Sequence, residues 1–178
     1  MTMTSTTKQP VSAKVITYTA LMTALIFIMT YVPKIPFPFG YAHLGDAMIF
    51  VAALFFPRRQ AALAAGIGSA LADFIGGYPV WMVATFIIKY LMVEVVFWIV
   101  RPDINHLRVL SARAILAILA SCVWMIVTYA IAGAVIYGSP AAGMAMLPGL
   151  ISKGVANAII AYVIAIGLDR MHFSLDTL

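Results

Sequence analysis

Residues 80–100 read VWMVATFIIKYLMVEVVFWIV, and this run contains only two charged side chains, Lys89 and Glu94. As an α-helix it would be about 31 Å long, which matches the roughly 30 Å hydrocarbon core of a lipid bilayer. The rest of the 178-residue chain has the same character, since 64% of it is hydrophobic and 10% charged, with a mean hydropathy of +1.05. This composition lies outside the range of soluble domains and predicts an integral membrane protein.

The apolar stretches on either side of this run extend the prediction to an all-α fold, a six-transmembrane-helix bundle. The predicted spans are 13–31, 43–56, 60–75, 80–100, 112–137 and 143–168. The second is short, which leaves open a bundle of five spans with a tilted or re-entrant segment. A single membrane domain is expected over 13–170, between a disordered tail at 1–12 and a second tail at 171–178.

The distribution of Lys and Arg predicts that the N- and C-termini are cytoplasmic. With six spans, eight of the 11 basic residues fall on the cytoplasmic side, which follows the positive-inside rule. They are Lys8, Lys14, Arg58, Arg59, Arg101, Arg108, Arg113 and Arg170. The net charge of +5 therefore reflects topology, and no aromatic-interleaved basic patch accompanies it that would indicate nucleic-acid binding.

Charged residues inside the apolar spans are the first candidates for a functional site. Asp46, Asp73, Lys89, Glu94 and Lys153 lie within or at the edge of spans, where each costs roughly 2.5–3.5 kcal/mol at mid-helix. In the predicted topology Asp46, Asp73 and Lys153 converge on the outer half of the membrane, with Lys153 about two turns into its span and Lys89 below them as a floor. The alternative is that these carboxylates and ammoniums pair only to fix helix packing.

Neighbouring polar and aromatic residues complete a candidate substrate pocket. Asn157 follows Lys153 by four residues and shares its helix face, whereas Lys89 and Glu94 are about 140° apart around their helix. Apolar walls with a few aimed polar groups are typical of small-molecule pockets. The aromatic candidates, Phe39, Tyr78 and Trp81, could instead belong to the interfacial belt of the membrane. His43 could be a polar residue whose hydrogen bonds are satisfied within the protein. The candidate substrate-binding residues are Phe39, His43, Asp46, Asp73, Tyr78, Trp81, Lys89, Lys153 and Asn157.

Small residues at four-residue spacing indicate close helix contacts. Gly68, Ala72 and Gly76, like Gly154 and Ala158, are expected to pack inside the bundle. Ala20 and Ala24 in the first span could instead serve a partner subunit.

Motifs for nucleotide hydrolysis, zinc proteolysis and serine hydrolysis are absent from the sequence. Cys122 is the single cysteine, which excludes a cysteine metal cluster, and neither a metal nor a cofactor is predicted. Any ATP-driven activity would have to be powered by another subunit.

Three stretches resemble a known family: TALMTAL with Ala20 and Ala24, HLGDAMIF at the start of the second span, and GIGSALADFIGGYP followed by TFIIKYLM. The chain is similar to the S components, the substrate-binding membrane subunits of energy-coupling factor (ECF) vitamin transporters. The HLGD and ADFIGGY patterns look most like the hydroxymethylpyrimidine and pyridoxine branch. Members for riboflavin, thiamine, biotin, pantothenate and queuosine precursors share the architecture.

This resemblance implies a non-enzymatic, multi-pass subunit in the plasma membrane of a prokaryote. It implies capture of a vitamin or precursor at the extracellular side, with pyridoxine or hydroxymethylpyrimidine favoured. The implied partners are a transmembrane coupling subunit (EcfT-like), which docks on the face of Ala20 and Ala24, and two cytoplasmic ATPases (EcfA-like). Toppling of the subunit within the membrane to release substrate is likewise implied by the resemblance alone.

Two rival functions remain open from the residues. Asp46 and Asp73 could form a catalytic carboxylate pair in an intramembrane enzyme. The chain could also be a small channel or assembly protein without a ligand.

Overall fold

The computed structural model describes residues 12–33, 35–37, 40–100, 109 and 111–171. The predicted tails, apart from Ser12 and Met171, and most of the basic segment after residue 100 lie outside these residues, as does Phe39. The predictions made for them stay predictions.

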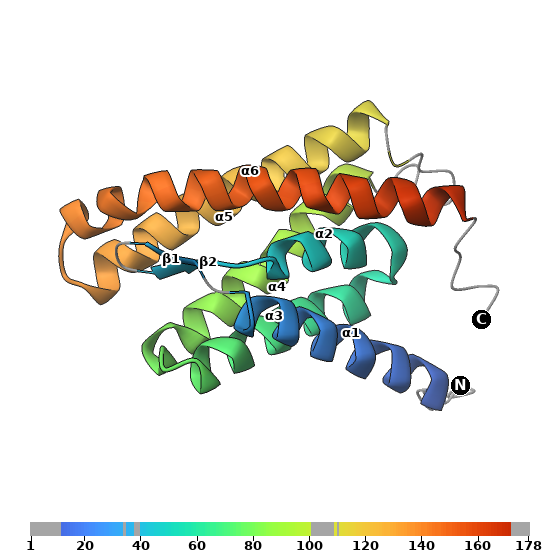
Figure 1. Cartoon of the computed structure of the whole chain (residues 1–178), viewed down its shortest axis with the longest axis horizontal. Coiled ribbons are helices and arrows are strands. Elements are labelled where there is room, and N and C mark those ends of the chain that lie inside the picture. Colours follow the sequence, from blue (N-terminus) through green and yellow to red (C-terminus); the bar gives the residue numbers. More distant parts are fainter. Residues whose placement is uncertain (1–11, 34, 38–39, 101–108, 110, 172–178) are drawn as a thin grey trace, which may run out of the picture.

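Six α-helices form the described structure, as the apolar pattern predicts (Figure 1). Their bounds are α1 (Ala13–Tyr31), α2 (Gly45–Phe55), α3 (Arg58–Ile75), α4 (Met82–Val100), α5 (Ala112–Ile136) and α6 (Pro140–Arg170), with a 3-10 turn η1 (Pro79–Trp81) before α4. Helix α6 begins three residues before the predicted span, so Lys153 lies deeper along it than the two turns expected from the sequence.

Four of these helices are long and apolar enough to cross a membrane: Ala13–Tyr31, Pro79–Val100, Ala112–Ile136 and Pro140–Arg170. Helix α2 has only 11 residues, and α3 carries Arg58, Arg59 and Asp73 within its 18. The six-helix bundle is therefore observed, while length and composition support four of its helices as full spans.

The helices close into a ring in the order α1, α3, α4, α5, α6, α2, with each contacting the next and α2 returning to α1. Helix α2 also contacts α3 and α4, which places it toward the centre of the bundle. Its residues 45–53 are all buried. An apolar helix covered on every side needs no polar face. The burial of α2 therefore agrees with its almost wholly apolar sequence.

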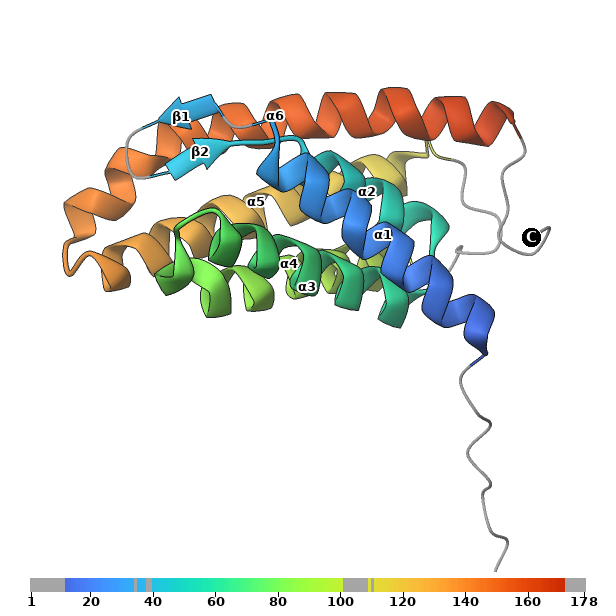
Figure 2. The ribbon, with the colours of Figure 1, turned by 60° about the horizontal axis from the view of Figure 1, so that its bottom comes forward.

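A short hairpin departs from the all-α prediction. Strands β1 (Ile35–Phe37) and β2 (Gly40–Ala42) are antiparallel, with Ile35 opposite Ala42. Figure 2 shows the hairpin lying along α6, which β2 contacts. Proline holds the residue before it in extended backbone, and Pro36 and Pro38 in this segment favour strands over a continued helix.

Glycines in the helices allow the close contacts predicted from their spacing. A Cβ added at Gly68 would lie 2.7 Å from the carbonyl oxygen of Thr23, so α1 and α3 could not approach as they do. Gly154 is buried against α5, where an added Cβ would lie at an ordinary contact distance of 3.4 Å from Met125. The prediction that these small residues serve packing inside the bundle is confirmed at both positions.

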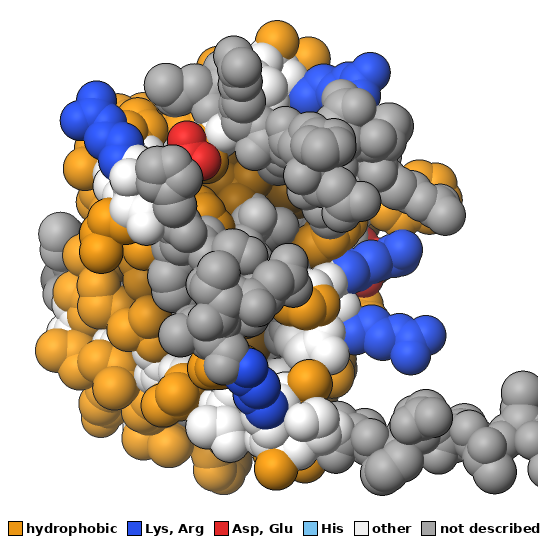
Figure 3. Space-filling view, turned by 90° about the vertical axis from the view of Figure 1, so that its right-hand side faces the viewer, with side chains coloured by type: hydrophobic (Ala, Val, Ile, Leu, Met, Phe, Trp, Pro, Cys, Tyr) orange, Lys and Arg blue, Asp and Glu red, His pale blue; other side chains and the backbone are white. Residues whose placement is uncertain are grey.

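One end of the bundle carries all the described Lys and Arg residues except the buried Lys89 and Lys153. This end combines the starts of α1, α3 and α5 with the end of α6. Figure 3 shows their side chains around the rim of this face. The positive-inside rule requires the basic residues to gather at one end in this way. That this end faces the cytoplasm remains a prediction. The residues at this end are Lys14, Arg58, Arg59, Arg113 and Arg170.

Candidate functional site

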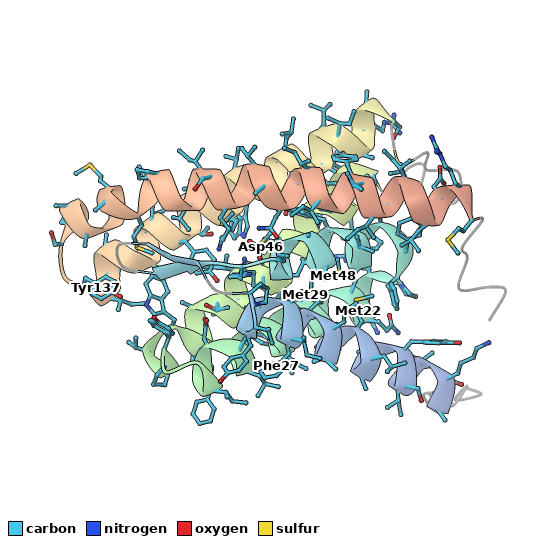
Figure 4. The ribbon with its side chains drawn as sticks, in the orientation of Figure 1. Met22, Phe27, Met29, Asp46, Met48 and Tyr137 are labelled. Atoms are coloured by element: carbon cyan, nitrogen blue, oxygen red, sulfur yellow. The ribbon has the colours of Figure 1, made fainter. Side chains whose placement is uncertain are left out.

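Asp46 is the centre of a buried polar cluster. It is the second residue of α2, is fully buried, and lies about halfway along the molecule (Figure 4). Lys89 of α4 donates a hydrogen bond to its Oδ1 at 2.5 Å, and the ammonium of Lys153 of α6 lies 3.5 Å from its Oδ2. Three helices thus place opposite charges together, which a buried carboxylate requires. Of the residues expected to converge, Lys153 lies beside Asp46, and Lys89, expected below them, is its nearest charged partner.

Tyr129 of α5 lies against both lysines and connects them to the fourth charged residue. The Nζ atoms of Lys89 and Lys153 are each 5.0 Å from the centre of its ring, within the range of cation–π attraction. Its hydroxyl donates to Thr85 Oγ1 at 3.0 Å, and Thr85 donates to Asp73 Oδ2 at 2.5 Å. Asp73 therefore belongs to the cluster through Thr85 and Tyr129.

Asn157 holds the start of α2 against α6. Its Oδ1 accepts from the backbone N–H of Ala47 at 2.9 Å, and its Nδ2 donates to the carbonyl oxygens of His43 and Lys153 at 2.8 and 2.9 Å. Both amide hydrogens are thus used within the chain. This geometry makes Asn157 a positioning residue rather than a free donor for a ligand.

His43 precedes α2, two residues outside the helix that the sequence predicts to include it. It is buried, and its Nδ1 accepts a hydrogen bond from the N–H of Gly45 at 3.1 Å. One ring nitrogen of His43 is thus used by the backbone at the start of α2. This contact supports the alternative of a satisfied polar residue.

The predicted aromatic residues divide between the interior and the surface. Trp81 is buried, with its ring 5.7 Å from that of Tyr129 and 6.1 Å from that of Tyr137, and its indole N–H donates to the Tyr137 hydroxyl at 3.4 Å. Figure 4 shows Tyr137 at one end of the bundle. Tyr78 is 38% exposed and does not share this buried position. The structure thus links Trp81 to the cluster through Tyr129.

Asp46 and Asp73, considered above as a catalytic carboxylate pair, have different contacts. Asp46 binds lysines and Asp73 binds Thr85, so the described contacts do not join them into a carboxylate pair. Glu94 pairs with Arg58 of α3, away from Lys89, which agrees with the angle of about 140° between the two residues around their helix. Within the described ranges no group of three His, Cys, Asp or Glu residues could hold a metal ion.

Thr85, Tyr129 and Tyr137 belong to this arrangement, although the sequence interpretation did not include them. Thr85 precedes Lys89 by four residues and so lies on the same helix face, a spacing that could have identified it. Tyr129 and Tyr137 carry no comparable local signal, because their contacts come from other helices.

A second candidate surface is an apolar groove of about 800 Å³ between α1 and α3, called here the α1/α3 groove. Ala20 and Ala24 line it and are exposed, so this pair does not serve packing inside the described bundle. Thr19 and Thr23 also line it, and each donates its hydroxyl to a carbonyl oxygen one turn earlier. The other lining residues are Val15, Ile16, Phe27, Arg59, Gln60, Leu63, Ile67, Leu71 and Ile75.

Three comparisons relate this chain to known proteins. The model of the family described as "ECF-type riboflavin transporter, S component" matches residues 10–170. A protein of Pyrococcus woesei, described as an uncharacterized protein in a gap 3' region, is 33% identical over 137 residues, which cover 76% of this chain and 88% of that protein. A solved structure reported under "Structure and mechanism of the S component of a bacterial ECF transporter" shares the fold, with a TM-score of 0.72 at 18% identity over 89% of this chain and 96% of the other.

Proposed function

The chain belongs to the S components of ECF-type transporters, and we propose that it captures a water-soluble vitamin at the polar cluster around Asp46, with riboflavin as the first candidate. As a transport subunit it is not an enzyme. The observation that carries the proposal is the burial of Asp46, Lys89 and Lys153 beside Tyr129, because buried ionisable groups in a membrane bundle mark ligand sites by default.

Riboflavin replaces the preference drawn from the sequence patterns. That preference, for pyridoxine or hydroxymethylpyrimidine, receives no support from the comparisons, whereas the matching family carries riboflavin in its description. A flat heterocycle suits the aromatic surroundings of the cluster, which include the neighbouring rings of Tyr129 and Trp81.

The α1/α3 groove fits the proposed docking of a transmembrane coupling subunit (EcfT-like), which would join this chain to two cytoplasmic ATPases (EcfA-like). Helices α1 and α3 pack closely at Gly68, and the small side chains of Ala20 and Ala24 in the groove leave room for another helix backbone. Docking at this face and location in the plasma membrane of a prokaryote are parts of the same proposal.

Titration of the purified protein in detergent tests the capture function. We expect riboflavin to quench tryptophan fluorescence saturably at one molecule per chain, because Trp81 lies beside Tyr129. Trp81→Phe should weaken binding, because Trp81 packs against Tyr129 in the cluster. Trp98→Phe is the matched control, since Trp98 is 72% exposed on the outside of the bundle and its replacement should leave the affinity unchanged. A folded protein that binds none of riboflavin, hydroxymethylpyrimidine, pyridoxine, thiamine, biotin or pantothenate would contradict the proposal.

A further inference from the structure

We infer that Asp46 Oδ2 and Lys153 Nζ together read one edge of the ligand, on which a hydrogen-bond donor and an acceptor lie side by side. The inference rests on the proposed function and specifies the substrate class: a neutral cyclic amide, imide or aminopyrimidine. These two atoms, which lie side by side, are called the Asp46–Lys153 gap.

The two oxygens of Asp46 differ in what they contact. Oδ1 accepts the short hydrogen bond from Lys89, whereas Oδ2 is buried and accepts no hydrogen bond from the described residues. Lys153 Nζ lies 3.5 Å from Oδ2, too far for a good charge-assisted bond, and 5.0 Å from the centre of the Tyr129 ring. A buried acceptor without a hydrogen bond is costly unless a further group satisfies it, and the ammonium beside it has hydrogens to donate.

The width of the gap matches one edge of a heterocycle. In a cyclic amide the nitrogen and oxygen are about 2.3 Å apart by standard bond lengths and angles. Two roughly parallel hydrogen bonds of about 2.9 Å from such an edge reach protein atoms that are about 3 to 3.5 Å apart. The separation of 3.5 Å between Oδ2 and Nζ falls at the upper end of that range.

The chemistry of the two protein groups fixes the order of the ligand groups. A carboxylate only accepts and an ammonium only donates, so the ligand N–H must face Asp46 and the ligand acceptor must face Lys153. The trans amide of an open chain points its N–H and C=O in opposite directions and cannot satisfy both. A ring that holds the amide cis, or an aminopyrimidine, presents the donor and the acceptor on one edge.

Charge balance within the cluster favours a neutral ligand. Among the buried Asp and Lys side chains of the cluster, the carboxylates of Asp46 and Asp73 are matched in number by the ammonium groups of Lys89 and Lys153. A ligand carboxylate or phosphate at the gap would add a buried charge without a counterion of its own. A neutral edge satisfies the two atoms and leaves the balance unchanged.

The test compares ligands that keep the edge with ligands in which it is blocked. The full-length protein in detergent is titrated with riboflavin and 3-methylriboflavin, and with 4-amino-5-hydroxymethyl-2-methylpyrimidine and its 4-dimethylamino analogue. Pyridoxine and pantothenate, which lack a cis amide or aminopyrimidine edge, complete the panel. We expect one parent compound to bind and its methylated form to bind at least about 100-fold more weakly, because a site built to hydrogen-bond an N–H rejects the analogue without it.

Protein variants test the other half of the edge. Lys153→Met should weaken binding of the same parent compound at least about ten-fold, since it removes the donor to the ligand acceptor. Glu94→Gln is the matched control, because Glu94 pairs with Arg58 away from the cluster, and should bind with wild-type affinity.

The outcomes separate this inference from the proposed function. Equal binding of a parent and its methylated form, or capture of pyridoxine or pantothenate in preference to both parents, would overturn the edge while supporting vitamin capture. Binding of the pyrimidine rather than riboflavin, with the methyl effect intact, would support the edge and change the vitamin. Failure of every compound to bind the folded protein would overturn both.

Discussion

The polar cluster around Asp46 and the α1/α3 groove differ in almost every physical respect. The cluster is buried and charged, and is built from α2, α3, α4, α5 and α6, whereas the groove is exposed and lined almost entirely by apolar atoms of α1 and α3. In a membrane an apolar groove cannot select a small polar molecule, but it can accept a helix through close packing. A charged cluster has the reverse properties. Under the proposed function, one small bundle would separate ligand selection at the cluster from subunit association at the groove.

The largest effect is expected from removing the central ion pair. Lys89→Met leaves Asp46 without its hydrogen-bonded partner and should destabilise the fold by about 3–5 kcal/mol. Lys153→Met is the matched control, because it keeps the Asp46–Lys89 pair and should change stability much less. Thermal unfolding in detergent measures both. Equal losses of stability would show that the two lysines are equivalent and that the Asp46–Lys153 gap is not distinct.

The next largest effect should fall on the groove alone. Ala24→Trp fills the α1/α3 groove with a bulky ring and should abolish co-purification with the coupling subunit, while ligand affinity of the isolated chain stays unchanged. Ala20→Trp should act in the same way. Leu21→Trp is the matched control, since Leu21 is 63% exposed on α1 but does not line the groove. Normal recovery of the Ala24→Trp complex would contradict docking at this face.

A smaller effect is expected where α2 begins. Asn157→Leu removes three hydrogen bonds to the backbone, each with a net value of about 1 kcal/mol, and should loosen the segment around His43 and Ala47. Hydrogen exchange of the backbone amides in that segment measures the change. The amides of α1 provide the internal control, and an increase there of the same size would show general destabilisation instead.

The smallest effect is expected outside both regions. Glu94→Gln weakens the ion pair with Arg58, which is partly exposed at the basic end of the bundle. Such pairs contribute little to stability. Unfolding, ligand affinity and complex recovery should all stay close to wild type, and a large loss in any of them would extend the site to this end.

The helices could be predicted from the sequence better than the contacts that individual side chains make. The bounds of α1 match the predicted span, because a long apolar run leaves a membrane helix few alternatives. The hairpin was missed, because each strand has only three residues and depends on its contact with α6. The spacing of Lys153 and Asn157 correctly placed them on one helix face. Only the tertiary structure shows that Asn157 is occupied by backbone groups while Asp46 Oδ2 is not.

The threonine hydroxyls of α1 make the surface of that helix less polar than its sequence suggests. Thr17, Thr19 and Thr23 each donate to a carbonyl oxygen four residues earlier, so they direct their hydrogen-bonding capacity into their own backbone. With those donors satisfied, the side chains offer mainly methyl groups to neighbouring molecules. The mean hydropathy of 1.6 for this helix, the lowest among the four long apolar helices, therefore understates how compatible its surface is with fatty-acid chains when no protein partner is bound.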